Sequence, residues 1–272
     1  MARLPRIAAV SYPVAIADCR WGVRARGSCG RCGSGWGLRR GCWTLIVLAM
    51  LAGARFYAVF GPAQVRWLFL AQVLVMWLLP AIFLTREGWR AIGLSSPRGG
   101  AAAIALCVAI GVLAGLAFFA ISMNAHGLPA DSWIASVRTG MQLDEMRKAM
   151  GPAAIFGLLA VPVLIVTPVG EEILFRGLIQ QAFAMRWNWI VGMVVNGLAF
   201  GLVLLHVHGL THDAAGFHLR LVSGELFVLG GVALSALFTQ CRMQTGSLFA
   251  AMAAHAGCNA AVISAVVLVP NG

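Results

Sequence analysis

Two carboxylates and an arginine stand together in an apolar part of the chain, in the sequence Glu171-Glu172-Ile-Leu-Phe-Arg176. Ionisable residues in such segments are costly to bury, so they are candidates for a functional site. On a helix, Glu172 and Arg176 are four residues apart and can pair on one face, whereas Glu171 points about 100° away. One carboxylate is then held in an ion pair, and its neighbour is available as a general base. The alternative is two acids at a helix start with a solvated salt bridge.

A histidine and an asparagine form the second group, His255-Ala-Gly-Cys-Asn259, again four residues apart. Both side chains project from one face of the last apolar segment. A proton carrier beside an amide donor is what the binding of an oxyanion requires. The alternative is a core histidine whose polar atoms are satisfied by neighbouring helices.

Two more histidines, His206 and His208, stand at the end of another apolar segment. Side chains two residues apart lie on opposite sides of a helix, so one helix can present only one of them to a site. We therefore predict one functional histidine here. His212 and His218 follow with Asp213, and these three residues are typical of a solvated polar loop.

The elements that must position these residues are membrane helices. Only 11% of the 272 residues are charged and 60% are hydrophobic, with a mean hydropathy of +0.86. A soluble domain has roughly 25% charged residues and needs them to cover its surface. The composition therefore excludes an ordinary cytosolic enzyme, a disordered chain and a nucleic-acid-binding module. We predict an all-α, polytopic transmembrane helical bundle with about seven to eight membrane helices.

Seven segments are apolar and nearly long enough to span a bilayer. They are Trp43–Phe60, Trp67–Leu84, Ala101–Met123, Gly151–Val166, Trp189–Leu205, Leu226–Gln240 and Ser247–Val269. An amphipathic segment, Gly170–Met185, carries the two carboxylates, and Thr-Pro-Val-Gly at 167–170 leaves open whether it forms one broken helix with the span before it. The division that follows is a basic tail at 1–42, N-terminal membrane helices at 43–150 and a catalytic membrane region at 151–269.

The basic residues predict the orientation in the membrane. Eight of the twenty lysines and arginines precede Trp43. Basic flanks usually stay in the cytoplasm. We expect a disordered cytoplasmic N-terminal tail, an integral protein of the bacterial inner membrane with lipid as its partner, and no nucleic acid. A single Cys-x-x-C pair, Cys29 and Cys32, is a weak zinc signal in this tail.

The ordered set of motifs resembles one known family. Glu-Glu-x-x-x-Arg at 171–176, a histidine about 30 residues later and His-x-x-x-Asn at 255–259 are similar to the CAAX-protease and bacteriocin-processing (CPBP, Abi) family of intramembrane proteases. The resemblance covers roughly residues 151–269. One motif of this sequence differs from the family pattern. The family has Phe-x-x-x-His, and here the residue four positions after Phe200 is Leu204 rather than histidine. His206 fits if Leu202 takes the place of the aromatic residue, and we prefer it because it stays within the apolar run. The alternative, His208, lies nearer to the face of Phe200 on a continuous helix.

The resemblance implies an intramembrane endopeptidase that acts on a peptide or membrane-protein substrate. Glu171 would activate a water, Glu172 and Arg176 would orient the site, and His206 and Asn259 would hold the oxyanion, with His255 completing the set. No cofactor is required in this reading. Zinc is the alternative, because two histidines and a glutamate can bind it, although no His-Glu-x-x-His motif is present. The competing functions are an inactive membrane scaffold or immunity protein of the same fold and, third, an ion or metal transporter, against which the lack of an internal repeat counts.

Overall fold

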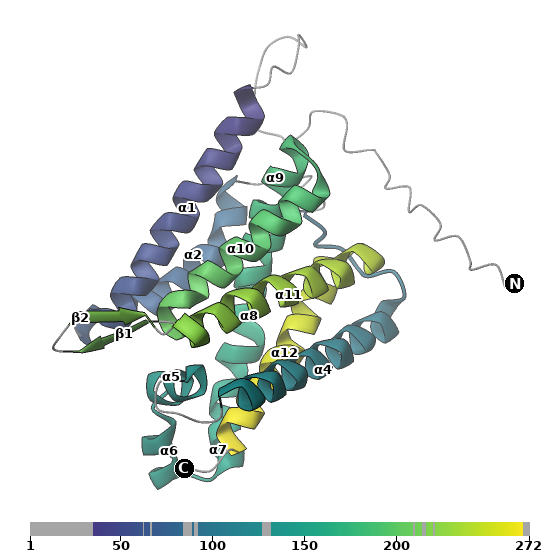
Figure 1. The fold of residues 1–272 in the computed structure, drawn as a ribbon. Helices are drawn as coiled ribbons and strands as arrows, with labels where there is room; N and C mark the ends of the chain where they lie inside the picture. Colours follow the sequence, from purple (N-terminus) through teal and green to yellow (C-terminus); the bar gives the residue numbers. More distant parts are fainter. Residues whose placement is uncertain are drawn as a thin grey trace, which may run out of the picture.

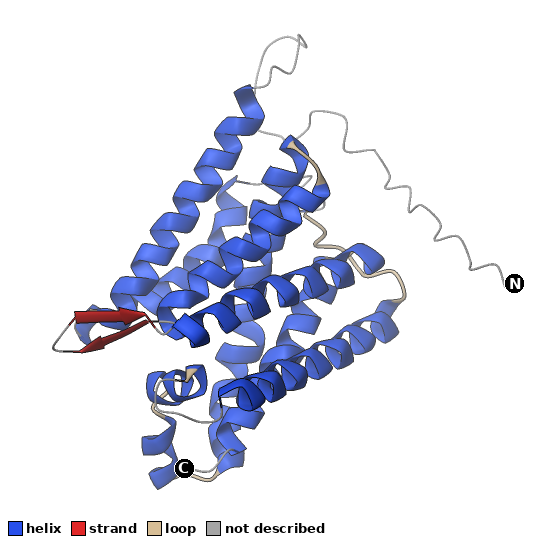
Figure 2. Cartoon of the chain, in the orientation of Figure 1, coloured by secondary structure: helices blue, strands red, loops and turns tan. Residues whose placement is uncertain are grey.

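The computed structural model describes residues 35–61, 63–65, 67–83, 89, 92–126, 132–208, 210–213, 216–219 and 221–268. These residues are almost entirely helical (Figures 1 and 2). The N-terminal part contains α1 (Gly35–Phe60), a 3₁₀ turn η1 (Ala63–Val65), α2 (Trp67–Phe83), α4 (Gly100–His126), α5 (Trp133–Gly140) and α6 (Leu143–Ala149). The C-terminal part contains α7 (Pro152–Ala160), η2 (Val161–Val166), α8 (Thr167–Glu172), η3 (Ile173–Ile179), α9 (Gln180–Arg186), α10 (Trp189–His208), β1 (Leu210–Asp213), β2 (Gly216–Leu219), α11 (Leu221–Thr245) and α12 (Leu248–Leu268).

The predicted fold class is confirmed, since every predicted span coincides with a helix. Four helices of the described chain are long and apolar enough to cross a membrane. They are Gly100–Ala125, Pro152–Ala184, Gly224–Thr245 and Leu248–Leu268. The first helix begins at Gly35, before the predicted start of the first span, and residues 1–34 of the predicted tail, with Cys29 and Cys32, lie outside the described residues.

The fourth span and the amphipathic segment after it form one unbroken helical run, Pro152 to Arg186. Its η2 and η3 parts are π-helical, with one more residue per hydrogen-bonded turn than an α-helix. The wider turn accommodates Pro168, which has no N–H to donate. Thr167 donates its N–H to the carbonyl of Pro162, five residues back. The helix therefore continues through Pro168, with its backbone hydrogen bonds shifted in register before the proline.

This shift in register leaves the backbone carbonyl of Val163 for another helix to satisfy. The carbonyl of Val163 would accept from Thr167 in an α-helix and from Pro168 in a π-helix, and neither N–H is available to it. The side chain of Asn259, on α12, donates to it instead, at 3.0 Å. The indole N–H of Trp77, on α2, donates to the carbonyl of Val166, at 3.0 Å, and gives the run a contact with a second helix. Donors such as the Asn259 side chain are how a membrane helix tolerates proline.

Glycines let α12 pack directly against α4. A Cβ atom at Gly111 would collide with the backbone of Ala254, and one at Gly257 would collide with the backbone of Val108. Small residues are the usual means of close helix contact in lipid. The contact holds α12, which carries His255, at the centre of the molecule.

A short antiparallel hairpin replaces part of the expected polar loop after α10. Strand β1 pairs with β2 from Leu210 opposite Leu219 to Asp213 opposite Gly216. Figure 2 shows it in red beside the ends of α1 and α10. The exposed ring of Phe217 contacts Phe56 and Phe60 of α1, so the hairpin rests on that helix.

Candidate active site

The carboxylate of Glu172 is the centre of a fully buried cluster. Its Oε1 lies 2.9 Å from Nη1 of Arg176, one helical turn away, and 2.8 Å from Nδ1 of His255 on α12. The predicted pairing of Glu172 with Arg176 is therefore confirmed. The wide turn of η3 still places residues i and i+4 on nearly the same face, which is why the pair survives in π-helical geometry.

His255 is held in one tautomer by this contact. A carboxylate only accepts hydrogen bonds, so Nδ1 of His255 carries the hydrogen and donates it to Glu172. The other ring nitrogen, Nε2, then faces Glu171, whose Oε2 lies 3.8 Å away. That separation is longer than a hydrogen bond. The two glutamates thus bracket the imidazole, one orienting it and the other facing its second nitrogen.

Aromatic rings enclose the two partners of Glu172, His255 and Arg176. The imidazole of His255 stacks on Phe238, with ring centroids 4.9 Å apart, and meets Phe200 edge to face at 5.7 Å. The guanidinium of Arg176 lies 4.7 Å above Phe200 and 5.2 Å from Phe238. Its nitrogens make no hydrogen bond within the described chain, so the ion pair with Glu172 and the ring faces stabilise it.

Glu171 is not the unpaired carboxylate that the sequence predicted. Its Oε1 accepts a hydrogen bond from Nη1 of Arg55, on α1, at 3.2 Å, and both side chains are more than nine-tenths buried. The prediction was wrong because it considered only partners on the same helix, and Arg55 is 116 residues away. Both glutamates are therefore ion-paired, each with an arginine of its own.

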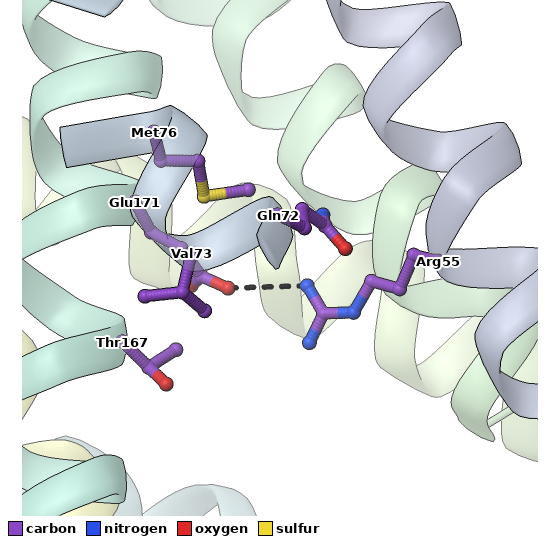
Figure 3. Close-up of a pocket in the computed structure, with 6 residues that line it drawn as sticks. All are labelled: Arg55, Gln72, Val73, Met76, Thr167 and Glu171. Carbon is purple, nitrogen blue, oxygen red and sulfur yellow. Dashed lines mark hydrogen bonds and ion pairs between the residues drawn. The ribbon is translucent and has the colours of Figure 1, made fainter. Parts of the chain in front are cut away.

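A small cavity, with room for about one water molecule, opens on the Arg55 side of this carboxylate. Figure 3 shows Glu171 and Arg55 bridging it, with the side chains of Gln72 and Thr167 turned toward the same space. Val73 and Met76 complete the lining. The carboxylate thus belongs to two environments, since one oxygen faces the cavity and the other faces His255.

Asn259 lies on the face of α12 that carries His255, as predicted, and is partly buried. One N–H of its Nδ2 is directed at the carbonyl of Val163, at 3.0 Å. The structure therefore gives it a stabilising contact with the long helix in addition to the oxyanion role expected from the sequence. A second N–H remains on the same nitrogen for any such role.

The sequence of this region is similar to one protein family. Residues 153–261 match the Rce1-like family model, described as type II CAAX prenyl endopeptidase. The resemblance to the CAAX-protease and bacteriocin-processing family is confirmed for this part of the chain. No curated protein and no solved structure matches the chain. At the level of the family, the match supports a CAAX-type intramembrane protease, and together with the long apolar helices it supports an integral membrane protein.

Within the Rce1-like region, the structure brings together Glu171, Glu172, Arg176 and His255. The side chains of His206 and His208, in the last turns of α10, lie outside the described residues, so the preference for His206 stays a prediction. Phe200 occupies the aromatic position of the Phe-x-x-x-His motif, and its side chain is buried against His255 and Arg176. The α10 helix therefore faces the site even though Leu204 stands where the family has histidine.

Three polar residues near the site were missed by the sequence reasoning. Arg55 and Gln72 come from α1 and α2, outside the Rce1-like region, and both line the cavity. Arg242, in the last turn of α11, is buried and donates to the carbonyls of Arg176 and Ile92. An arginine and a glutamine inside apolar spans were the available signal, because such residues are rare in membrane helices.

Among the described residues, no three His, Cys, Asp or Glu side chains are arranged to hold a metal ion. Glu172 already has both of its contacts on Oε1, one from Arg176 and one from His255. The zinc alternative depends on His206 or His208, whose side chains are not described. Metal independence therefore remains a prediction.

Proposed function

We propose that this chain is an intramembrane endopeptidase in which Glu171 activates a water for attack on a peptide bond of a membrane-associated substrate. The observation that carries the proposal is the placement of its carboxylate, which lies at the wall of a cavity with Oε1 on Arg55 and Oε2 toward His255. A general base must be within reach of the water it deprotonates and must be held in a fixed orientation. Arg55 and His255 supply that orientation from two different helices.

The chemistry needs one proton to move twice. Glu171 takes a proton from the water while the water oxygen bonds to the peptide carbonyl carbon. The π electrons of the carbonyl group move onto the carbonyl oxygen. When the oxyanion collapses, the carbon–nitrogen bond breaks, and the proton on Glu171 passes to the leaving amine. Carboxylic acid and amine are the products, and no co-reactant other than water is required.

The remaining residues orient the base and stabilise charge. Glu172 fixes His255 through Nδ1–H, in the way that a buried carboxylate orients a catalytic imidazole. Nε2 of His255 then faces the space beside Glu171. The oxyanion is held by donors on α10 and α12, which we assign to His206 and to the free N–H of Asn259.

The test is proteolysis by the protein purified in detergent. The probe is a quenched fluorescent peptide that ends in a farnesylated Cys-aliphatic-aliphatic-X sequence, the substrate class in the family description, followed by a pooled peptide library. We expect Glu171→Gln to lower kcat by about 10²- to 10⁴-fold, the usual contribution of a general base. Glu145→Gln is the matched control, because Glu145 is an exposed carboxylate paired with Lys148 on α6.

Each outcome has a distinct meaning. Activity that survives a chelator and disappears in Glu171→Gln supports a metal-independent glutamate peptidase. Activity that the chelator removes and zinc restores would contradict metal independence. Equal loss in the Glu171 and Glu145 variants would contradict a specific role for Glu171.

A second function, a membrane scaffold without catalysis, is favoured by one observation. Leu204 stands four residues after Phe200, where the family motif has histidine. If no histidine of α10 reaches the site, the oxyanion loses a donor, and loss of one such donor lowers kcat by about 10²- to 10³-fold. A folded wild type that cleaves neither the farnesylated peptide nor the library would favour this function.

A further inference from the structure

Gln72, on α2, is a buried amide whose polar atoms are unsatisfied. Its side chain is 4% exposed, and neither Oε1 nor Nε2 has a hydrogen-bond partner among the residues that the structure describes. A buried polar group without a partner is destabilising, so native proteins keep few of them and often keep them for function. Gln180 shows the ordinary arrangement in this chain, because it is equally buried and its Oε1 accepts a hydrogen bond from Thr239 at 3.2 Å.

The amide of Gln72 is directed at the cavity beside the proposed base. The cavity is lined by Glu171, Thr167 and Arg55 as well as Gln72, and Figure 3 shows the Gln72 side chain between those of Met76 and Arg55. The carboxylate of Glu171 is occupied by Arg55 at Oε1. A group that enters this cavity would therefore meet an unpaired amide next to a carboxylate that is already charge-balanced.

We propose that Gln72 binds a peptide group of the substrate, with Nε2–H donating to the peptide carbonyl and Oε1 accepting from the peptide N–H. The proposal rests on the peptidase function. A carboxamide offers one donor side and one acceptor side, and a peptide group presents the same pair in reverse. A lipid ester accepts hydrogen bonds but donates none, so it would leave Oε1 unsatisfied.

This contact would align an extended substrate beside Glu171, and it would not depend on which side chains the substrate carries. It is supplied by α2, outside residues 153–261, so the Rce1-like region would provide the reacting groups and the N-terminal helices would hold the substrate backbone. Binding energy that is equal in the ground state and the transition state alters KM and leaves kcat unchanged. Gln72 is thus a positioning residue with a defined kinetic signature.

The test compares Gln72→Met with wild type in two assays. The first is cleavage of the farnesylated peptide, where we expect KM to rise by roughly 5- to 100-fold, the range for a lost hydrogen bond to a buried group, with kcat changed less than about twofold. The second is binding of the same peptide, fluorescently labelled, to Glu171→Gln protein with and without Gln72→Met. Its Kd should rise by a similar factor. Gln180→Met is the matched control, and it should leave KM and Kd unchanged.

A series of peptides with one backbone N–H at a time replaced by an ester oxygen identifies the peptide group. One of these esters should bind wild type more weakly than the parent peptide and should show no such difference in Gln72→Met. Equal ester penalties in both proteins, or an unchanged KM and Kd, would overturn the proposal.

The two proposals fail in different ways. Cleavage by wild type with Gln72→Met unaffected would leave the peptidase function standing and remove this inference. Binding that depends on Gln72 in a protein that cleaves nothing would support the inference and contradict catalysis. A wild type that neither binds nor cleaves the peptide would contradict both.

Discussion

The ion pair between Arg55 and Glu171 makes a prediction that the structure quantifies. Arg55→Leu leaves a buried carboxylate without its cation. At 3.2 Å, with an effective dielectric constant near 20, the interaction energy is about 5 kcal/mol. Breaking a buried pair by removing one partner typically costs about 3–5 kcal/mol, which is consistent with that value. For a chain of this size, such a loss lowers Tm by roughly 10 °C.

The double variant Arg55→Leu/Glu171→Leu separates this effect from packing. Replacing both partners by apolar side chains of similar volume is often close to neutral, so we expect the double variant to be more stable than Arg55→Leu alone. Unfolding in detergent micelles can be followed by the fluorescence of the nine tryptophans. Lys148→Met, which breaks an exposed pair with Glu145, should leave Tm unchanged.

If the stability losses of Arg55→Leu and Glu171→Leu, each measured alone, add up to the loss of the double variant, Arg55 and Glu171 are not energetically coupled. The assignment of Arg55 as the residue that holds the base would then be wrong.

Three further changes have definite expected outcomes. Glu172→Gln should lower kcat by at least about 10²-fold while peptide binding is retained, because the neutral amide loses the negative charge that pairs with Arg176 and stabilises the oriented imidazole of His255; a kcat near wild type would contradict this. Gly257→Ala should reduce the free energy of unfolding by about 1–3 kcal/mol, since its Cβ meets the backbone of α4, whereas Gly53→Ala, which meets nothing, should not destabilise. Asn259→Leu should cost about 1–3 kcal/mol even in inactive protein, because it leaves a carbonyl of the long helix unsatisfied, and unchanged stability would refute that role.

The helices could be predicted from the sequence because hydropathy and length specify membrane spans almost by themselves. Trp67 begins α2 as predicted, and the predicted last span exceeds α12 by one residue at each end. The continuity at Pro168 could not be predicted in this way. It depends on a donor that arrives from Asn259, on a helix distant in sequence. Rules based on local sequence include the hydrogen bond that proline removes, but they do not include a replacement hydrogen bond from another helix.

In the candidate site, too, contacts within one helix could be predicted from the sequence, and contacts between helices could not. The pairing of Glu172 with Arg176 follows from helical spacing, and the sequence predicted it. The meeting of His255 with both glutamates follows from no spacing rule and was expected only through the family resemblance. Arg55 was missed because helical spacing finds only local partners. A charge in an apolar span was nevertheless visible in the sequence and should have been treated as a site residue.

The choice between His206 and His208 is the prediction that most affects catalysis. Phe200 contacts His255, so the α10 turn that carries Phe200 lies at the site. Along a helix axis, His206 is about 9 Å beyond Phe200, and His208 is about 12 Å beyond it, at the last residue of α10. Rotation favours His208, which is about 80° from the face of Phe200 against about 120° for His206. Depth favours His206, because it stays within the apolar run, and an oxyanion donor must lie beside the base.

We therefore expect His206→Ala to lower kcat by about 10²- to 10³-fold and His208→Ala to leave it within about twofold, measured on the same farnesylated peptide. The reverse result would assign the donor to the last residue of α10 and would mean that the end of the helix turns inward over Phe200. Full activity in both variants would show that α10 supplies no oxyanion donor. The second N–H of Asn259 would then be the donor that remains, and Asn259→Asp, which keeps the shape and removes both N–H groups, should abolish turnover and also lose the contact with the carbonyl of Val163.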